Sequence, residues 1–372
     1  MYGRKADTDV FVIGGGPAGL AAAIAVRRRG LSVTVADGSE PPVDKACGEG
    51  LMPETLYALG DLGVKLPPGV GFRFRGIRFC QRDAQVSADF PQGRGIGLRR
   101  TALHELLVSE AEKSGVTLLW KSPVVGISHD AVCLPNRSFP ARWIVGADGG
   151  QSRVRRWADL DSCVANSQRF ATRRHYRVRP WSEYVEIYWG PRLQAYVTPV
   201  SAYEVCIVAM AMSPDQADFD RALALLPELQ KRLACAEIAS RERGAVTALQ
   251  SLAKVWRGNV ALIGDASGGV DAITGEGLRL TFRQADSLAA AIERGDLRGY
   301  GRDHARISRK PLWMGALMRQ LGHYDPLRRR MLLTLSRNPG LFAQLLAIHA
   351  ATTTVKNIFS AGSHFGWQLL AG

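Results

Sequence analysis

Val10-Phe-Val-Ile-Gly14-Gly-Gly16-Pro-Ala-Gly19-Leu is the stretch that decides the fold of this chain. A short apolar strand runs into a Gly-x-Gly-x-x-Gly turn, and an alanine-rich helix follows. Gly14 permits the tight turn, Gly16 leaves room for a pyrophosphate, and Gly19 lets helix and strand pack closely. Phosphate favours the helix N-terminus because the amides there are unpaired and the dipole is positive. The stretch predicts a dinucleotide-binding βαβ unit.

An acidic residue at the end of the next strand supports this prediction. The strand Leu31-Ser-Val-Thr-Val-Ala leads directly to Asp37, whose carboxylate can bind the hydroxyl pair of a ribose. A glycine trio alone also fits an ordinary strand–turn–helix. The flanking strands and the acid at this distance favour the dinucleotide interpretation, and with it a redox enzyme.

Composition and charge narrow the class of protein. The 372 residues give room for about two domains, and the net charge of +14 suits phosphate ligands, an anionic membrane or nucleic acid. No nucleic-acid motif or aromatic-interleaved basic stripe occurs, so we expect no nucleic-acid partner. The six cysteines form no C-x-x-C pair, which indicates reduced thiols and no metal site. We see neither a signal peptide nor a membrane-spanning segment, and we expect a cytoplasmic protein.

Two later motifs place a Gly-Asp pair after an apolar strand. The first is Ile144-Val-Gly-Ala-Asp148-Gly, and the second is Val260-Ala-Leu-Ile-Gly264-Asp265, followed by Thr-Gly-Glu-Gly-Leu at 274–278. Either pair alone fits a strand-ending turn. The three motifs in this order resemble the FAD-dependent hydroxylase superfamily typified by para-hydroxybenzoate hydroxylase, and within it the geranylgeranyl reductase-like branch. The resemblance covers most of residues 8–300.

The resemblance implies roles for individual residues. Asp265 matches an aspartate that accepts a hydrogen bond from a ribityl hydroxyl, and Asp148 matches one that organises the bend between the cofactor and nicotinamide contacts. The helix that opens at Gly277 would direct its amides at the flavin pyrimidine edge and stabilise the anionic reduced flavin. Arg100 resembles an arginine that reaches the pyrophosphate, although its neighbour Arg99 could serve instead.

The family's loop beside the isoalloxazine ring matches the segment that contains Lys45 and Cys47. Lys45 could supply a point charge to a phosphate or to the flavin. Cys47 could line the catalytic face, but packing is the better interpretation because no activating His stands nearby in sequence. The full set of residues expected to bind FAD is Gly14, Gly16, Pro17, Ala18, Gly19, Asp37, Lys45, Ala46, Cys47, Arg100, Val124, Asp148, Gly264, Asp265, Gly275, Glu276, Gly277 and Leu278.

We expect non-covalent FAD and a transient nicotinamide reductant. No second Gly-x-Gly-x-x-Gly provides a permanent NAD(P)H site, and in the family the nicotinamide visits, reduces the flavin and leaves. Arginines near 153–156 and 173–179 could attract its phosphates. A solvated basic face explains them equally well.

Departures from the family pattern bear on the activity. Gly268 stands where aromatic hydroxylases have His, and Ala272 replaces their usual proline. Cys47-Gly-Glu-Gly-Leu and Thr274-Gly-Glu-Gly resemble the reductase branch instead. That branch's Tyr-x-Trp-x-Phe-Pro motif appears only in degraded form, as Gln-Ala-Tyr-Val-Thr-Pro at 194–199. The chain matches neither named activity closely.

The fold class predicted is α/β with α+β character: a Rossmann-type FAD-binding domain, an inserted antiparallel-sheet substrate domain and a helical C-terminus. Periodicity predicts helices over 53–62, 100–114, 219–234 and 277–291, and nucleotide-sheet strands over 116–120 and 143–145. The predicted boundaries are 1–72, 99–165 and 255–300 for the FAD-binding domain, 73–98 and 166–254 for the substrate domain, and 301–372 for the C-terminal region.

The preferred function is an NAD(P)H-dependent monooxygenase acting on a hydrophobic, phenolic or polyketide-like compound. The first alternative is an ene-reductase of the geranylgeranyl reductase type, and the second is an FAD-binding protein without turnover. No catalytic residue is assigned. Tyr188, Tyr196 and Thr198 are candidate walls of the substrate pocket, although a plain hydrophobic sheet face explains them as well.

The C-terminal region is basic and has large apolar residues at helical spacing. Pro-Leu-Trp-Met at 311–314 and Pro-Gly-Leu-Phe at 339–342 are examples. We expect these helices to cap the cavity of a lipophilic small-molecule substrate, since such stripes usually face a core. Weak contact with an anionic membrane is the secondary expectation. The sequence makes no prediction of oligomeric state.

Overall fold

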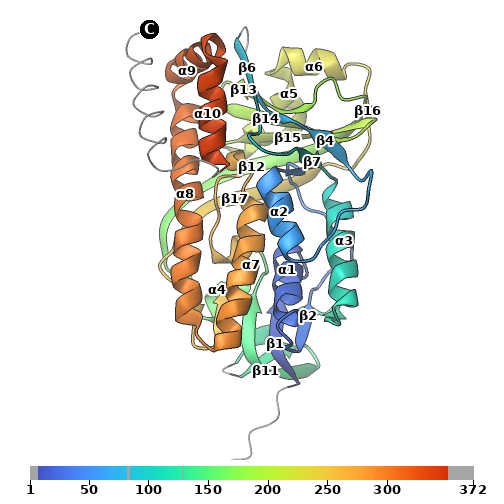
Figure 1. Cartoon of the computed structure of the whole chain (residues 1–372), viewed down its shortest axis with the longest axis vertical. Coiled ribbons are helices and arrows are strands. Elements are labelled where there is room, and N and C mark those ends of the chain that lie inside the picture. Colours follow the sequence, from blue (N-terminus) through green and yellow to red (C-terminus); the bar gives the residue numbers. More distant parts are fainter. Residues whose placement is uncertain (1–6, 82–83, 129, 351–372) are drawn as a thin grey trace, which may run out of the picture.

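The computed structural model describes residues 7–81, 84–128 and 130–350. A nucleotide-binding sheet with its helices forms one end of the molecule, and a large, mainly antiparallel sheet forms the other (Figure 1). The C-terminal helices run along one side and span both ends. This arrangement confirms the predicted α/β architecture.

The nucleotide-binding sheet is parallel apart from its edges. Its strands, in spatial order, are β18 (Trp256–Arg257), β19 (Val260–Leu262), β11 (Arg137–Gly146), β1 (Thr8–Ile13), β2 (Val33–Ala36) and β8 (Thr117–Leu119). β18 is antiparallel, and β10 (Ala131–Leu134) and β9 (Gly126–Ile127) extend β11 as an antiparallel flap. All three motifs therefore end neighbouring strands of one sheet.

β1 is central because both of its faces are apolar. Val10 and Val12 pack into the cluster beneath the helices, whereas Phe11 and Ile13 pack into a second cluster on the opposite face. A strand buried on both sides reads as a continuous apolar run, as this one does.

Helices cover one face of this sheet. They are α1 (Pro17–Arg27), α2 (Pro53–Asp61), α3 (Arg100–Lys113) and α7 (Gly277–Arg294), while α4 (Arg153–Trp157) lies on the opposite face with the flap. α1 begins on Pro17, whose missing amide costs nothing in a first turn. α7 ends at Gly295, which adopts the left-handed conformation of a C-cap at φ 73°.

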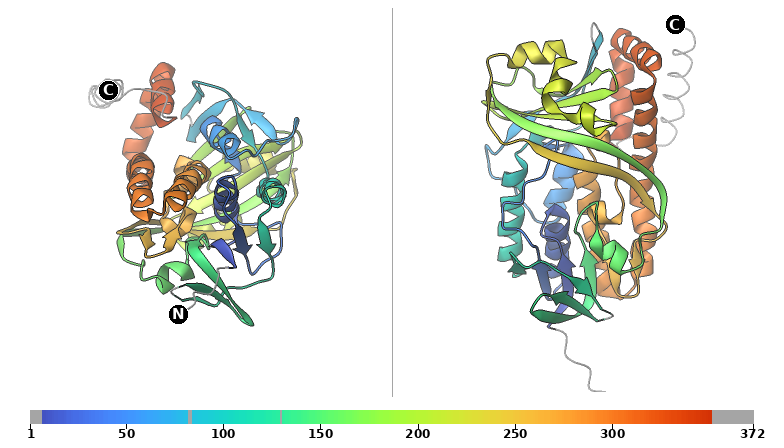
Figure 2. Two further views of the ribbon diagram at one scale, coloured as in Figure 1. Left: turned by 60° about the horizontal axis from the view of Figure 1, so that its bottom comes forward. Right: turned by 180° about the vertical axis from the view of Figure 1, so that it is seen from behind.

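The second sheet carries the inserted region. Its spatial order is β16 (Glu237–Ile238), β12 (Cys163–Arg177), β15 (Glu204–Ala211), β14 (Leu193–Ser201), β13 (Tyr184–Gly190), β5 (Gly76–Gln81) and β6 (Ala84–Asp89), with β17 (Arg243–Leu252) also paired to β12. The paired strands β12 and β17 are long and reach down beside the nucleotide-binding end (Figure 2, right). A small sheet of β3 (Gly50–Leu51), β7 (Gly95–Gly97) and β4 (Phe72–Phe74) lies between the two parts.

Helices pack on both faces of the second sheet. α5 (Phe219–Ala224) and α6 (Pro227–Leu233) bury one face, and the helices α8 (Leu297–His323), α9 (Asp325–Arg337) and α10 (Pro339–His349) bury the other. The predicted single helix over 219–234 is thus wrong. It breaks before Pro227, which cannot donate the amide that a continuous helix needs.

Some of the predicted domain boundaries fall between these helices and strands, and others fall inside them. The boundary at 254/255 falls between β17 and β18, while those at 72/73, 165/166 and 300/301 fall inside β4, β12 and α8. Both β12 and α8 run continuously from one part of the molecule to the other.

Among the described helices, none is long and apolar enough to cross a membrane. The predicted C-terminal segment after residue 350 lies outside the described residues.

Candidate flavin site

The glycine turn has the close contacts that a dinucleotide turn requires. Gly14 has φ 111°, and a Cβ there would lie 2.5 Å from the Ala147 carbonyl oxygen. A Cβ on Gly19 would overlap the carbonyl oxygen of Gly14. Gly16 differs, because the space beside it is open to at least 4 Å. Two glycines are required by protein packing, and Gly16 alone faces free space.

These contacts bring the three motifs together. Gly14 touches Ala147, the residue before Asp148. A Cβ on Gly264 would lie 2.7 Å from the Cβ of Ala18. The glycine turn and the first turn of α1 therefore contact both later motifs.

Asp37 is held by backbone amides. One carboxylate oxygen accepts a hydrogen bond from the Gly15 amide at 2.7 Å, and the other accepts from the Ser39 amide at 2.8 Å. Each oxygen retains a lone pair, so the side chain is fixed in place and can still accept from a ribose hydroxyl.

His104 was not assigned a role from sequence, yet it supports the same turn. Its Nε2 lies 2.8 Å from the Gly15 carbonyl oxygen, and the side chain is fully buried. Burial lowers its pKa, so the ring is neutral at pH 7 and Nε2 carries the proton donated to that carbonyl. The available signal was spacing, since His104 follows Arg100 by four residues on a helix and shares its face.

Arg100 rather than Arg99 is available to a phosphate. The Arg99 guanidinium forms an ion pair with Glu204 at 2.6 Å. Arg100 donates its amide to Glu49, but its buried Nε has no hydrogen-bond partner among the described residues. Buried polar groups are rarely left unpaired. An anion such as the FAD pyrophosphate would complete this site, and the open space at Gly16 would accommodate it.

The third motif, which contains Gly264 and Asp265, forms a second part of the predicted site. Gly264 has φ 61° and donates its amide to the buried Gln284 Oε1 at 3.0 Å. The carboxylate of Asp265 pairs with Lys45 Nζ at 3.1 Å, and more than a third of each side chain is exposed. The structure therefore places the predicted loop residue Lys45 beside the predicted ribityl acceptor Asp265.

Replacing Asp265 tests this end of the site. We expect Asp265→Ala to weaken FAD binding by about 1.5–3 kcal/mol, because it removes a charged hydrogen-bond acceptor. Asp159→Ala is the control, since Asp159 forms a similarly exposed pair with Arg257 on another surface. Fluorescence titration of apoprotein with FAD measures both. Equal affinities in the two variants would remove Asp265 from the site.

The other predicted cofactor residues lie at helix ends, in turns or in buried positions. Asp148 caps α4, accepting from Ser152 Oγ at 2.5 Å and from the Arg153 amide at 2.7 Å. Glu276 is buried, pairs with Arg279 at 2.8 Å and lies 3.6 Å from His349 Nε2. The side chains of Val124 and Leu278 pack into apolar clusters, and Pro17 is buried at the start of α1. Gly275 adopts the left-handed conformation just before α7, and Gly277 is the first residue of that helix.

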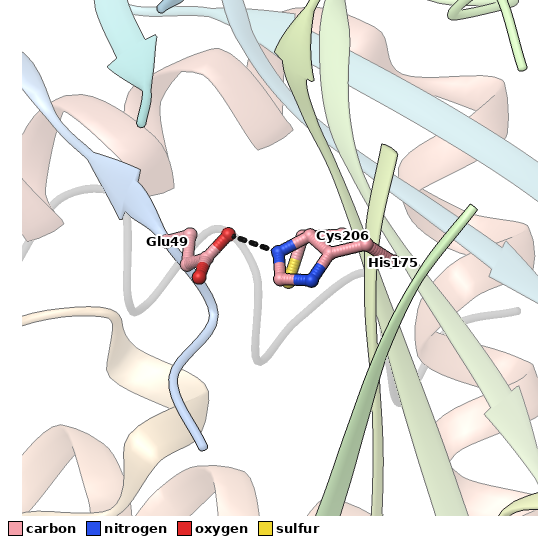
Figure 3. Close-up of side chains that lie close together, drawn as sticks. All are labelled: Glu49, His175 and Cys206. Carbon is pink, nitrogen blue, oxygen red and sulfur yellow. Dashed lines mark hydrogen bonds and ion pairs between the residues drawn. The ribbon is translucent and has the colours of Figure 1, made fainter. Parts of the chain in front are cut away.

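The loop that contains Lys45, Ala46 and Cys47 is anchored by Glu49, which sequence analysis had not singled out. Glu49 has φ 57°, a conformation uncommon outside glycine, and its side chain is fully buried. Its Oε2 lies 2.7 Å from His175 Nε2, as Figure 3 shows, and its Oε1 lies 3.0 Å from Arg173 Nη1. The loop is therefore tied through Glu49 to strand β12.

The charges around Glu49 form a compensated network. Arg173 also binds both carboxylate oxygens of Asp44, at 3.1 and 2.9 Å. Burial opposes ionisation of Glu49, but hydrogen bonds and charge from its partners lower its pKa overall. The carboxylate is thus ionised at neutral pH.

Glu49, His175 and Cys206 also bring three potential metal ligands together, with ligand atoms within 4.8 Å of one another (Figure 3). The arrangement suits an ion-pair network better. Arg173 already occupies one oxygen of Glu49, and burial raises the pKa of the Cys206 thiol well above its usual value. A thiol must lose its proton to bind a metal.

The arginines predicted to attract NAD(P)H are largely committed elsewhere. Arg155 pairs with Asp161, Arg174 with Asp220 and Arg177 with Glu237. Arg173 is buried and pairs with Asp44 and Glu49, whereas Arg153, Arg156 and Arg179 of the same clusters are exposed. Attraction of the NAD(P)H phosphates by these exposed arginines stays a prediction.

The predicted pocket residues lie on two different faces of the second sheet. Tyr188 packs in the cluster beneath α5 and α6, and its hydroxyl donates to Glu186 at 2.8 Å. Tyr196 packs on the opposite face with the C-terminal helices. Grouping Tyr188 with Tyr196 is wrong, because residues on adjacent antiparallel strands share a face only when the pairing register allows it. Thr198 donates to the Gly48 carbonyl at 2.7 Å and so anchors the Cys47 loop.

His304 supports the third motif from α8, and it makes stability depend on pH. Its Nε2 lies 2.9 Å from Ser267 Oγ, and burial lowers its pKa to about 4. The unfolded chain binds the proton more readily. Stability is therefore complete above about pH 6.5 and is lost as pH falls toward 4, by up to about 3 kcal/mol.

We expect His304→Gln to flatten this part of the stability profile. Urea unfolding of both proteins between pH 4 and 7 measures it, and the difference between them isolates His304 from other buried histidines. Parallel profiles would contradict the assignment.

Comparison with known proteins agrees with this geometry. The FAD binding domain family model matches residues 7–302. The menaquinone reductase of Mycobacterium tuberculosis (strain CDC 1551 / Oshkosh) is 28% identical over 355 residues, covering 88% of this chain and 84% of that protein. A geranylgeranyl bacteriochlorophyll reductase-like structure from Thermoplasma acidophilum superposes with a TM-score of 0.76 at 19% identity, covering 98% of both chains.

A p-nitrophenol 4-monooxygenase from Pseudomonas putida superposes equally well, with a TM-score of 0.76 at 19% identity, covering 91% of this chain and 96% of that one. At such identities the two structures show a shared fold and do not separate reduction from oxygenation. FAD is the cofactor of this fold, and binding by the glycine turn, Arg100 and the Asp265 turn stays a prediction. The chain belongs to the FAD binding domain family and is an FAD-dependent oxidoreductase.

Proposed function

We propose that the enzyme is a flavin-dependent reductase that saturates a C=C bond in a lipid of the polyprenyl or quinone class. The observation that carries the proposal is the extent of the menaquinone reductase match. It covers 88% of the chain, more than the FAD binding domain at residues 7–302, and so it reaches beyond the cofactor domain. A match confined to the FAD-binding motifs would carry no information about substrate.

The second sheet has an apolar face that supports a lipophilic substrate. Its face toward α8–α10 carries Ile187, Trp189, Tyr196, Val208 and Met210 in one apolar cluster. Between this face and α8 lies a small hollow that is lined by Trp189 and Met210 and also by three arginines, Arg169, Arg192 and Arg319. The apolar cluster, and not this hollow, supports a lipophilic substrate, because sites for hydrophobic ligands are lined mainly by apolar side chains.

The chain's own residues would orient the reaction and exclude water. Bound FAD supplies the two-electron chemistry. The amides at the start of α7 favour negative charge on the reduced cofactor. Glu49 and Thr198 hold the Cys47 loop, and Tyr196 and its neighbours form the apolar wall. The glycine turn, Arg100 and Asp265 would hold the cofactor, which would supply the hydride for the C=C bond with NAD(P)H as the external reductant.

Oxygenation of a hydrophobic compound, preferred from sequence, stays the second candidate. The superposition on the p-nitrophenol monooxygenase shows that the fold is compatible with it.

One experiment decides between the two. Enzyme with photoreduced flavin is mixed with menaquinone without oxygen, and the product is analysed by mass spectrometry. Reduction of a C=C bond predicts flavin reoxidation with a product that stays heavier by two hydrogens after the quinone ring is reoxidised in air, because reduction of the ring alone is reversed by oxygen. Oxygenation predicts no anaerobic product and, in air, a product heavier by one oxygen. Repeating the flavin reduction with NADH and with NADPH identifies the reductant. No lipid reduction in the absence of oxygen would overturn the proposal.

A further inference from the structure

The outer face of α8 exposes several large apolar side chains to solvent. Trp313, Leu317 and Tyr324 are 59%, 42% and 60% exposed. Their spacings of four and seven residues place them on one side of the helix, or at its end for Tyr324. Leu327, 42% exposed, follows at the start of α9. Large apolar side chains exposed singly are common, but a contiguous row of them marks a contact surface.

Arginines continue the same row toward the start of α8. Arg302, Arg306 and Arg309 lie eleven, seven and four residues before Trp313, and all three are exposed. The surrounding segment is strongly basic, since residues 297–349 contain ten Lys and Arg against two Asp and Glu. The row therefore has one cationic half and one apolar half.

The inner faces of the same helices belong to the substrate side of the molecule. Leu321, Met331 and Leu332 pack into the apolar cluster that also contains Tyr196 and Trp189. Arg319 and Gly322 line the cavity between α8 and the sheet. The exposed row and this cavity therefore lie on different sides of α8.

We propose that this face of α8 and the start of α9 is a docking surface for an anionic lipid bilayer. Trp313, Leu317, Tyr324 and Leu327 enter the interfacial layer, and Arg302, Arg306 and Arg309 contact lipid phosphates. Charge complementarity favours a bilayer over a neutral protein partner, and tryptophan and tyrosine are the aromatic residues enriched at membrane interfaces. The inference deepens the proposed function by stating where the lipid substrate is supplied.

The test is co-sedimentation of the full chain with FAD bound. The probes are phosphatidylcholine vesicles with and without 30% phosphatidylglycerol. We expect binding only to the anionic vesicles and a decrease with added salt, because each arginine near such a surface contributes about fivefold to affinity. Trp313→Ser with Leu317→Ser should lower binding at least about tenfold, since two buried apolar side chains are lost. Arg302→Gln with Arg309→Gln should lower binding and reduce its salt dependence.

Tyr203→Ser is the matched control, because Tyr203 is 60% exposed on a hairpin of the second sheet. It should bind vesicles like the unaltered protein. Retained flavin absorbance shows that each variant is folded. Equal binding to neutral and anionic vesicles, or no loss in the Trp313/Leu317 variant, would overturn the proposal. A change in subunit number by light scattering with unchanged vesicle binding would assign the face to contacts between copies instead.

Reduction of detergent-solubilised menaquinone is measured separately in the same variants. Its rate should be unchanged in the Trp313/Leu317 variant, while the rate with menaquinone in vesicles should fall. If the unaltered protein reduces menaquinone neither in detergent nor in vesicles, the proposed function is contradicted, and vesicle binding stands as an independent result.

Discussion

Gly19→Ala is expected to destabilise the apoprotein by at least about 3 kcal/mol and to abolish FAD retention, whereas Gly16→Ala should impair only FAD binding. A Cβ on Gly19 would overlap the Gly14 carbonyl oxygen, and backbone cannot move aside as a side chain can. At Gly16 nothing lies within 4 Å and φ is −72°, which any residue adopts. The methyl group of Gly16→Ala would therefore meet only the cofactor.

The two variants separate the packing role of this motif from its binding role. Urea unfolding of FAD-free protein measures stability, and we expect Gly16→Ala to remain within about 0.5 kcal/mol of the unaltered chain. Fluorescence titration with FAD should show an affinity at least about tenfold weaker, or about 1.4 kcal/mol. Undiminished FAD affinity in Gly16→Ala would mean that the pyrophosphate does not lie against this turn.

Local patterns were sufficient to predict the nucleotide-binding part. The strand, glycine turn and helix between Val10 and Val26 have short-range causes, and the structure has each element where the sequence predicts it. Each of the three motifs follows an apolar strand, and the structure places these strands side by side in one parallel sheet, so the motifs meet at the same end of it. The contacts of Gly14 with Ala147 and of Gly264 with Ala18 are the result.

The second sheet was harder to predict because its side-chain placement depends on long-range register. Tyr188 and Tyr196 are both aromatic residues on β-rich segments, but the pairing of Tyr188 with Ala195 puts Tyr196 on the other face. Glu49 was missed for a similar reason. Its partners Arg173 and His175 lie more than 120 residues away, and no local pattern connects them.

The ion-pair partners of the clustered arginines were also hard to predict from sequence, because they lie far away along the chain. Sequence shows that Arg173, Arg174 and Arg177 are clustered, which suggests a basic face. Arg173 on β12 is buried and pairs with Asp44 and Glu49. Arg174 pairs with Asp220, and Arg177 pairs with Glu237. Net charge is visible in a sequence, whereas its compensation is visible only in the fold.

Arg173→Met is the second variant with a large expected effect, a loss of about 3–5 kcal/mol of unfolding free energy. Arg173 is 2% exposed and is the shared partner of Asp44 and Glu49. Removing it leaves the fully buried carboxylate of Glu49 without its arginine and leaves Asp44 with Arg243 alone, which is more costly than the net contribution of the ion pair itself. Arg177→Met on the same strand is the control. Its pair with Glu237 is more than 60% exposed on both sides and is worth at most about 1 kcal/mol.

The pH dependence of this loss identifies its cause. Burial opposes ionisation of Asp44 and Glu49, but hydrogen bonds and charge from their partners lower both pKa values overall. Their stabilisation is therefore present above the unfolded-state pKa of about 4 and disappears as pH falls through the lower folded-state values. The difference between the unaltered chain and Arg173→Met should shrink as pH falls from 7 to about 3, with most of the change below about pH 4, because protonated carboxyls no longer need a cation. Urea unfolding across this range measures it. A difference that stays constant with pH would mean that Arg173 stabilises the fold by packing, and that the Cys47 loop is not held by charge.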